Sequence, residues 1–338
     1  MKDNVNLCLI GAGRAGMIHA RNFVSKVPHA RMISVCDPSE EACRAAVLEL
    51  GIETYFTDYR EALEDERVDA VVVVTPTAYH KDIVVAAARA GKHILCEKPM
   101  AMTQEECREM IAAAEENHVK LQVGFMRRFD ASFMRAREIL ESGEIGDLVL
   151  VKSLTRGPSI PKPWMYDIHK SNGPLAEVNS HDIDTMRWLS GSEFKTVYAL
   201  AGNYRCGEAR EEFPDFYDNV ILNTRFESGA LGCLDGAQGV RYGYDARVEI
   251  LGTCGSVMLG GLQDKTTVTY TKDRGKTSDV IQSWTYLFRE AYVNEDISFV
   301  EAVREDSPVK VTGLDGLKAV QVVNAGNRSI VTGQVVEI

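Results

Sequence analysis

The feature that most constrains this chain is a glycine-rich turn near its first residue. Residues 5–10 (VNLCLI) form an apolar run, residues 11–16 are GAGRAG, and residues 17–27 have the pattern of a helix. A strand that leads through G-x-G-x-x-G into a helix is the context that separates a dinucleotide-binding turn from an ordinary glycine-rich one. The chain is therefore expected to contain a nucleotide-binding βαβ unit.

Each of the three glycines of this turn meets a different steric requirement. Gly11 permits the tight turn, Gly13 lets a pyrophosphate approach bare backbone, and Gly16 lets the helix pack close to the strand. The phosphates are expected at the helix N-terminus, where backbone N–H groups such as those of Arg14 and Ala15 favour anions.

A second apolar run, residues 31–36, ends in Asp37. This acid lies about 20 residues past the last glycine, where a carboxylate accepts hydrogen bonds from an adenosine ribose. The competing interpretation is a turn residue before Pro38. Because an acid repels a 2′-phosphate and no arginine follows closely, the sequence predicts NAD rather than NADP as the cofactor.

Composition limits the partners and the compartment. The 338 residues are too many for one ordinary domain and suit two, and the net charge of -11 without a basic stripe excludes nucleic acid and anionic membranes. No apolar run approaches the roughly 18 residues of a membrane span, and the first apolar run lacks the flanks of a signal peptide. The eight cysteines include no C-x-x-C pair, so a reduced cytoplasm is expected, and structural zinc is not.

Strand-like and helix-like segments alternate through residues 1–125. Strands that alternate with helices of this length predict a right-handed, doubly wound parallel sheet, the Rossmann form of the α/β class. Ligands of such sheets bind at the carboxyl ends of the strands. The residues at or just beyond those ends are Gly11, Asp37, Thr75, Glu97 and Met126.

Residues 126–338 have a different pattern and are predicted to form a second α/β domain. Short turns separate several strands of alternating polarity, so its sheet is expected to be large, open and mostly antiparallel. A last helix, about residues 314–331, is expected to pack back on the first domain. The other segments expected are a linking helix at 130–142, a strand at 147–157, a proline-rich loop at 158–173, one helix at 174–189, and strands at 219–226, 230–238 and 246–251.

Lys98 lies directly after the strand predicted at residues 93–96, between Glu97 and Pro99. A cationic cofactor nearby disfavours the charged form of a lysine, which prepares its amine to hydrogen-bond a hydroxyl or the alkoxide formed from it. The competing interpretation is a surface Lys-Pro turn. Spacing alone leaves both open.

Glu177, His181 and Asp184 are spaced four and three residues apart within the helix expected at 174–189, so they are predicted to share one helix face. Histidine titrates near neutral pH, and a carboxylate on one ring nitrogen fixes the tautomer of the other, so the three side chains suit proton transfer. A solvated charged face and a metal site are the competing interpretations. Because further metal ligands are not evident, no metal is predicted.

Three other places are candidates for binding. Of Arg127 and Arg128, one is expected to bind a substrate hydroxyl or phosphate while the other forms a salt bridge. Tyr242 belongs either to a plain turn or to a polyol site. His80, after Thr75-Pro76, is expected to cap a helix or to contact the cofactor.

Together these motifs resemble the Gfo/Idh/MocA oxidoreductases, and within that family the inositol 2-dehydrogenases, over essentially the whole chain. E-K-P after a strand, combined with H-x-x-D after a glycine-proline helix start, is highly specific. The matching positions are the turn at 11–16, Asp37, Thr75-Pro76 with His80, Glu97-Lys98-Pro99, residues 124–130 (GFMRRFD), His181 with Asp184, and residues 242–245 (YGYD).

The resemblance implies an NAD-binding domain and a substrate domain whose open sheet assembles the chain into a homo-oligomer, a tetramer or a dimer. Lys98 and His181 match the family's catalytic lysine and histidine. Glu177 stands where the family usually has aspartate. The extra methylene moves the carboxylate by roughly 1.5 Å, enough to bind a different pattern of hydroxyls.

The expected function is therefore oxidation of one secondary hydroxyl of a cyclic polyol or sugar by NAD. His181 is expected to take the hydroxyl proton, directly or through Lys98, while Glu177 or Asp184 orients the imidazole. Two other functions use the same turn. An NAD-retaining glycoside hydrolase would show no net redox change, and an NAD-sensing protein would have no use for Lys98 and His181.

Overall fold

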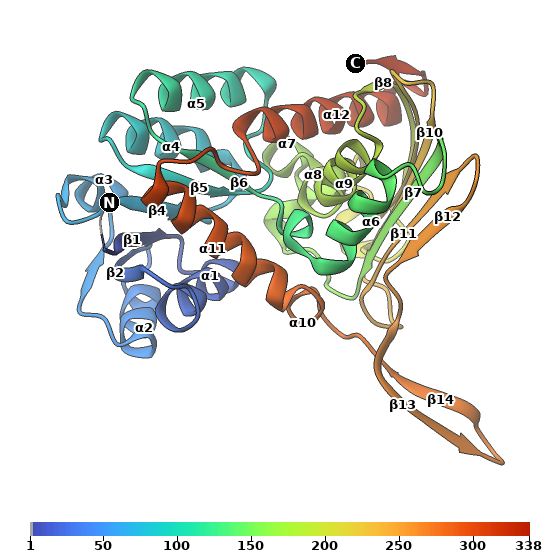
Figure 1. The fold of residues 1–338 in the computed structure, drawn as a ribbon, viewed down its shortest axis with the longest axis horizontal. Coiled ribbons are helices and arrows are strands. Elements are labelled where there is room, and N and C mark those ends of the chain that lie inside the picture. Colours follow the sequence, from blue (N-terminus) through green and yellow to red (C-terminus); the bar gives the residue numbers. More distant parts are fainter. Residues whose placement is uncertain (1–2) are drawn as a thin grey trace. The chain divides into compact units, whose positions relative to one another are not determined.

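The structure, a computed structural model, describes residues 3–338 and divides into two compact units (Figure 1). The first unit is the chain up to Phe129 together with Glu290–Val320, and the second is Asp130–Arg289 together with Gln321–Ile338. The sequence prediction ended the first domain at residue 125 and returned only the last helix to it. In the structure the second segment of the first unit is Glu290–Val320, which contains most of helix α11 (Arg289–Glu305) and only the first part of the last helix, α12 (Gly313–Thr332). The rest of α12 belongs to the second unit.

The first unit is built on a six-stranded sheet in the order β3-β2-β1-β4-β5-β6, and every neighbouring pair is parallel. This confirms the predicted Rossmann sheet. The strand order reverses between β1 and β4, and a crevice outside the carboxyl ends of the strands at such a point is where open α/β sheets bind ligands. The strands are β1 (Val5–Ile10), β2 (Ala30–Cys36), β3 (Thr54–Phe56), β4 (Ala70–Val73), β5 (His93–Glu97) and β6 (Leu121–Gly124).

Local signals fix the ends of the helices in this unit. The Ser39 hydroxyl accepts a hydrogen bond from the Ala42 N–H at the start of α2, and Gly51 ends that helix with a φ of 68°. Thr103 and Glu106 form a capping box at the start of α5. The helices of this unit besides α11 are α1 (Arg14–Ser25), α2 (Glu40–Leu50), α3 (Tyr59–Glu64), α4 (His80–Arg89), α5 (Gln104–Glu116) and the 3₁₀ turns η1 (Thr77–Tyr79) and η2 (Met126–Phe129).

The second unit contains a seven-stranded sheet in the order β12-β11-β7-β10-β9-β8-β15. All neighbours are antiparallel except the parallel pair β10 and β7, which confirms the predicted mostly antiparallel sheet. The strands are β7 (Leu148–Gly157), β8 (Phe194–Gly202), β9 (Asn219–Phe226), β10 (Leu231–Gln238), β11 (Asp245–Gly252), β12 (Ser256–Leu259) and β15 (Val336–Glu337).

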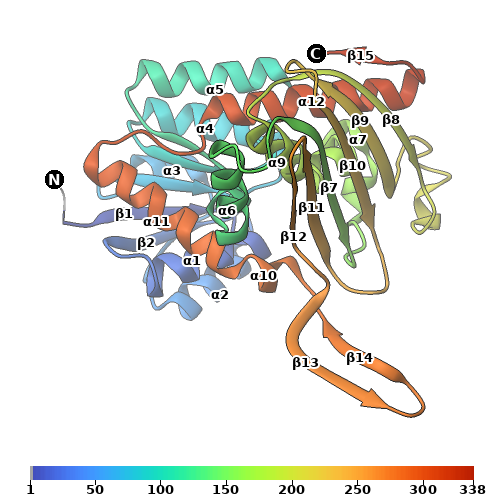
Figure 2. The ribbon, with the colours of Figure 1, turned by 45° about the vertical axis from the view of Figure 1, so that its right-hand side comes forward.

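Helices cover one face of this sheet and leave the other open (Figure 2). On the covered side, Gly326 of α12 (Gly313–Thr332) lies so close to Leu175 and Leu222 that a Cβ there would come within 2.8 Å of the first. The other helices of the unit are α6 (Ala131–Glu141), α7 (Ile168–Ser171), α8 (Gly173–Glu177), α9 (Ser180–Ser190), α10 (Trp284–Leu287) and the 3₁₀ turns η3 (Pro163–Tyr166) and η4 (Gly207–Ala209).

Two local predictions in this unit were wrong. The loop expected at 158–173 contains η3 and α7, and the single helix expected at 174–189 is two helices, α8 and α9. Between them the Asn179 N–H bonds the Pro174 carbonyl, five residues back, which widens the turn and interrupts the α-helical pattern. Periodicity does not reveal this break, because no glycine or proline marks it.

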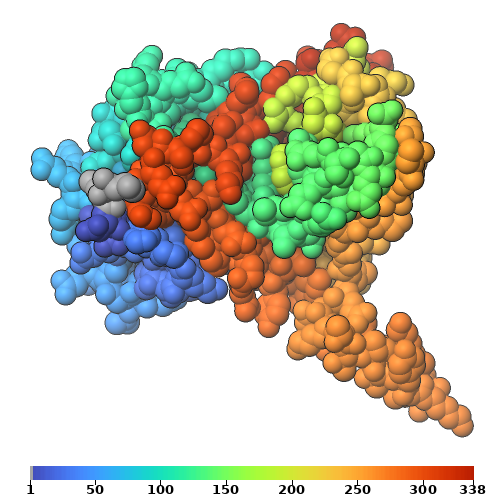
Figure 3. Space-filling view, viewed as in Figure 1, coloured from blue at the N-terminus to red at the C-terminus, as the bar shows by residue number. Residues whose placement is uncertain are grey.

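A hairpin of β13 (Gln263–Thr271) and β14 (Gly275–Val280) forms a separate two-stranded sheet whose side chains are almost all exposed (Figure 3). Gly275 closes its turn with a φ of 64°. Among residues 3–338, no helix combines the length and apolar character needed to cross a membrane.

Candidate active site

At two of the three glycine positions in the turn at residues 11–16, steric contacts leave no room for any other residue. Gly11 has a φ of 105°, and a Cβ there would lie 2.5 Å from the Val74 carbonyl oxygen at the end of β4. A Cβ on Gly16 would lie 2.0 Å from the Gly11 carbonyl oxygen. The turn therefore packs against its own helix and against the neighbouring strand with no room for a side chain.

Gly13 is different, because a Cβ there would meet nothing within 4 Å. It stands at the N-cap of α1, which no side chain caps, and the first helical bond runs from the Met17 N–H to the Gly13 carbonyl. Helix N–H groups beside open space suit the pyrophosphate of a dinucleotide. The residues present thus fit NAD at this turn.

Asp37 is tied to this turn by its own carboxylate. One oxygen accepts the Ala12 N–H at 2.9 Å, and the other accepts the Ser39 N–H at 2.9 Å. A carboxylate offers about four lone-pair positions, so these two bonds leave capacity for the hydroxyls of a ribose. The tertiary fold therefore holds Asp37, the predicted ribose-binding residue, beside the turn predicted to bind the phosphates.

His80 joins two strand ends in the first unit. Its buried ring lies 2.8 Å from the Thr75 carbonyl oxygen through Nε2 and 2.9 Å from the Pro99 carbonyl oxygen through Nδ1. Burial lowers the pKa of His80 below its ordinary value. The ring nitrogens thus face backbone carbonyls, and the contact positions the loop after β4 against the turn that carries Lys98.

Lys98 is half-buried directly after β5, and its peptide bond to Pro99 is cis. The Lys98 N–H donates to one oxygen of the buried Glu97 carboxylate at 2.9 Å, and the other oxygen lies 3.1 Å from His19 Nε2. Glu97 therefore anchors the lysine's backbone from inside the unit. Sequence reasoning missed His19, because no local pattern connects residues 19 and 97.

The end of β6 leads into η2, where Met126 and Arg127 are both buried. The neighbouring Arg128 forms the predicted salt bridge, with Asp315 of α12 at 3.0 Å. The two arginines thus have different surroundings, and Arg127 is the one that stays a candidate for binding.

In the second unit, Glu177 is the last residue of α8, while His181 and Asp184 lie on α9. His181 and Asp184 are three residues apart on one helix and buried, as the spacing predicts. The helix break separates Glu177 from them. The proposed trio therefore does not lie on one continuous helix, and the turn at Asn179 decides where Glu177 points relative to the other two.

Asp182, which the sequence analysis passed over, anchors α9 to the sheet. Its fully buried carboxylate accepts hydrogen bonds from the Ser153 hydroxyl at 2.6 Å, the Thr155 hydroxyl at 2.9 Å and the Asn179 amide at 2.9 Å. These bonds fix the first turn of the helix that carries His181. The only sequence signal was an acid flanked by His181 and Ile183.

Tyr242 stands between β10 and β11 with 40% of its surface exposed. Its hydroxyl donates to Asp245 at 3.1 Å. The following Gly243 has a φ of 122°, and a Cβ there would lie 2.6 Å from the Ile281 carbonyl oxygen, so glycine is required for this turn. The phenol is accessible and held in place, as a binding residue needs to be.

Fold and turn together define a class, the NAD-binding oxidoreductases with a Rossmann domain. Residues 5–125 match the Gfo/Idh/MocA oxidoreductase family, NAD-binding Rossmann fold, and residues 133–258 match the Gfo/Idh/MocA C-terminal domain. The chain belongs to the Gfo/Idh/MocA family.

Relatives of known activity cover the whole chain. It is 35% identical over 338 residues to scyllo-inositol 2-dehydrogenase (NAD(+)) of Bacillus subtilis, covering 100% of this chain and 97% of the relative. It is 33% identical to myo-inositol 2-dehydrogenase of Thermotoga maritima, covering 95% of each. The crystal structure of scyllo-inositol dehydrogenase from Lactobacillus casei with bound NAD(H) and scyllo-inositol is 26% identical, with a TM-score of 0.90 and 99% of each chain covered.

Alanine substitutions at Gly13 and at Gly16 should affect different properties, cofactor binding for the first and stability for the second. Gly13→Ala is expected to leave thermal stability unchanged and to weaken NADH binding at least tenfold, because its methyl occupies the space left for the phosphates. Gly16→Ala is expected to destabilise the protein by about 1–3 kcal/mol, because the clash with Gly11 lies inside the fold. Thermal melts and NADH fluorescence titrations measure both. Wild-type NADH affinity in Gly13→Ala would contradict the assignment.

Asp182→Ala should destabilise the protein by about 3 kcal/mol, because three buried donors lose their acceptor. Asp182→Asn keeps one oxygen and should lose less. Urea unfolding measures the difference, with the exposed Asp215→Ala in the same unit as the control. Equal midpoints for Asp182→Ala and Asp215→Ala would refute the anchoring role.

Proposed function

We propose that this protein is an NAD-dependent inositol dehydrogenase, which oxidises one secondary hydroxyl of a cyclic polyol to a ketone. The observation that carries the proposal is full-length similarity to inositol dehydrogenases in a chain that keeps both Lys98 and His181. When bound, the nicotinamide ring accepts the hydride, with its electron pair, from the carbinol carbon. The hydroxyl proton goes to the protein.

His181 is the proposed acceptor of that proton. Its imidazole is buried and is carried by a helix whose first turn Asp182 anchors, and a general base needs such a fixed backbone position. Lys98 is proposed to hydrogen-bond the hydroxyl and to stabilise the alkoxide as the proton leaves. Glu177 or Asp184 orients the imidazole, and Arg127 and Tyr242 bind other hydroxyls of the ring.

The cofactor residues divide into those that contact the dinucleotide and those that hold them. Gly11 to Gly16 and Asp37 are proposed to bind the pyrophosphate and the ribose, with Thr75, Pro76 and Met126 beside them. His80 and Glu97 are proposed to act indirectly, by hydrogen bonds that position the backbone of Thr75, Lys98 and Pro99.

We further propose that the protein assembles into a homo-oligomer through the open face of the second sheet, as a tetramer or a dimer. The register of the strands puts Leu200, Ile221, Leu231 and Leu251 on one face, and their side chains are 59%, 50%, 45% and 41% exposed. Arg225 and Asp235 lie between them on the same face, and a surface that mixes exposed apolar and charged side chains suits an interface between protein copies. Its cross-strand ion pair, Lys152 with Glu249, adds polar groups that a second copy of the same face can match.

The compartment proposed is the cytoplasm. All eight cysteines are free thiols and six of them are buried, as is usual where thiols stay reduced.

Lys98→Ala and His181→Ala should each lower kcat for scyllo- or myo-inositol by about 10²–10⁴, because each removes a group that handles the proton or the alkoxide. The dissociation constant for NADH should change by less than about twofold. Stopped-flow NADH formation and NADH titration measure the two quantities, with the exposed Lys310→Ala as control. Glycoside cleavage without net NADH in the wild type, or full turnover in both variants, would overturn the proposal.

Ile221→Arg should lower the oligomeric mass in light scattering, because it replaces the apolar partner of Leu200 on the proposed interface with a charge. The matched control is Leu48→Arg, an exposed leucine of α2 in the first unit. An unchanged mass for Ile221→Arg would exclude this face as the interface.

A further inference from the structure

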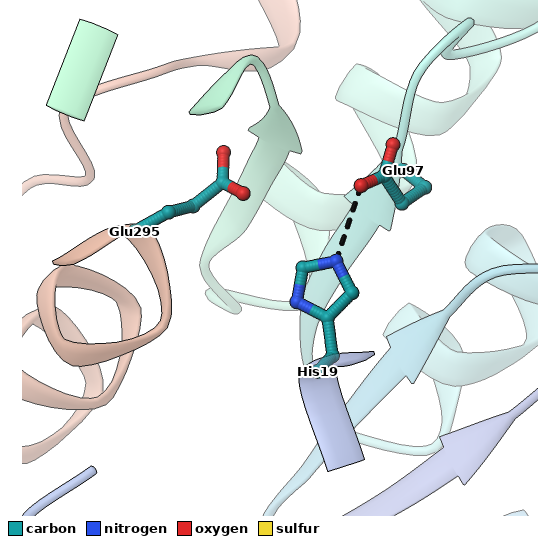
Figure 4. Close-up of side chains that lie close together, drawn as sticks. All are labelled: His19, Glu97 and Glu295. Carbon is teal, nitrogen blue, oxygen red and sulfur yellow. Dashed lines mark hydrogen bonds and ion pairs between the residues drawn. The ribbon is translucent and has the colours of Figure 1, made fainter. Parts of the chain in front are cut away.

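A buried chain of hydrogen bonds lies behind the turn that carries Lys98. His19 of α1 is fully buried, and its Nε2 lies 3.1 Å from one oxygen of Glu97 (Figure 4). Its Nδ1 lies 2.6 Å from one oxygen of Asp296. The second oxygen of Glu97 accepts the Lys98 N–H at 2.9 Å. The chain thus runs from α11 through α1 and β5 to the backbone of the lysine, all within the first unit.

Each member of this chain is held on more than one side. The second oxygen of Asp296 accepts the Asn22 amide at 2.9 Å, and the ring of Tyr292 packs edge-on to the His19 ring at 5.3 Å. Gly124 adjoins the Glu97 carboxylate so closely that a Cβ there would lie 3.0 Å from the carboxyl carbon. Glu97 therefore has little freedom to move toward β6.

The charge state of the ring fits two carboxylate partners. Burial by itself lowers the pKa of His19, but the adjoining Asp296 and Glu97 carboxylates raise it well above its ordinary value. A protonated imidazole donates from both nitrogens, so both contacts are satisfied at once. Removing the ring would leave two buried carboxylates without their shared cation, which is costly.

We propose that His19 is a positioning residue for the reaction, which acts through Glu97 to hold the Lys98 turn in the geometry that the chemistry needs. This inference rests on the proposed role of Lys98. His19 touches no reacting atom. A displacement of about 1 Å in a reacting group is enough to cost roughly 10² in rate, so a network that fixes the lysine's backbone has a measurable effect.

The same residues do not require an ion to explain them. Glu295 of α11 also points toward His19 and Glu97, and ligand atoms of the three lie within 4.8 Å of one another. Both nitrogens of His19, however, already bond carboxylate oxygens directly. The hydrogen-bonded network thus accounts for the positions of His19 and Glu97 without an ion.

The test is a double-mutant cycle between His19 and Lys98. His19→Leu is expected to lower kcat about 10²-fold with the NADH dissociation constant little changed. In the Lys98→Ala background the same substitution is expected to lower single-turnover rate by no more than about twofold, because the amine that it mispositions is already absent. His19→Gln, which keeps one donor, should recover part of the loss.

Gly124→Ala supplies an independent route to the same effect, because its methyl presses on Glu97 without removing a polar group. It should lower kcat and leave NADH binding unchanged. Met110→Ala, a buried α5 variant outside this network, is the control: it should lower the melting temperature and leave kcat unchanged at temperatures below its melt.

Equal losses from His19→Leu in the wild-type and Lys98→Ala backgrounds would overturn the positioning role, as would wild-type kcat in both His19→Leu and Gly124→Ala. Full activity in both Lys98→Ala and His181→Ala would instead overturn the proposed function. The two failures are therefore distinguishable.

Discussion

The first unit depends on a steric constraint, the close approach of the Gly11 turn to the end of β4. The Gly11 backbone reaches the Val74 carbonyl at a distance that excludes any Cβ, and Gly16 seats α1 against the same turn. This packing brings the helix N-terminus and the ends of β1, β2 and β4 to one edge of the sheet. Asp37 then bonds the Ala12 N–H, which fixes the acid and the turn as one piece. The proposed recognition of phosphate and ribose rests on that geometry.

A second feature occurs once in each unit. Each proposed catalytic residue is the chain neighbour of a buried carboxylate: Glu97 precedes Lys98, and Asp182 follows His181. Neighbouring side chains point in different directions from the backbone, so an inward acid can be bonded to the interior while its neighbour faces elsewhere. Glu97 bonds His19, and Asp182 bonds Ser153 and Thr155. In both places the buried acid gives the functional residue a fixed backbone.

The glycine turn supports NAD binding, and the similarity to inositol dehydrogenases supports the proposed reaction. The first comes from the local sterics of Gly11, Gly13 and Gly16, and the second from the whole chain. Glu177 is the last residue of α8, directly before the wide turn at Asn179. That turn separates the Glu177 carboxylate from α9, the helix that carries His181 and Asp184.

The sequence by itself determined the elements whose signals are local. Period-2 and period-3.6 patterns, the caps at Ser39, Gly51 and Thr103, and the spacing from Gly16 to Asp37 were enough for the Rossmann sheet, its turn and the strand ends. These depend on residues within a few turns of one another along the chain.

Only the tertiary structure decided the rest. His19, Glu97 and Asp296 come together from positions 277 residues apart at the extremes, and Asp182 meets its hydroxyl partners on β7 across the interior of the second unit. The helix break at Asn179 likewise follows from long-range packing, since its side chain fits against Gly236 of β10. Hydrogen-bonding partners distant in sequence leave no periodic trace, so no pattern along the chain can identify them.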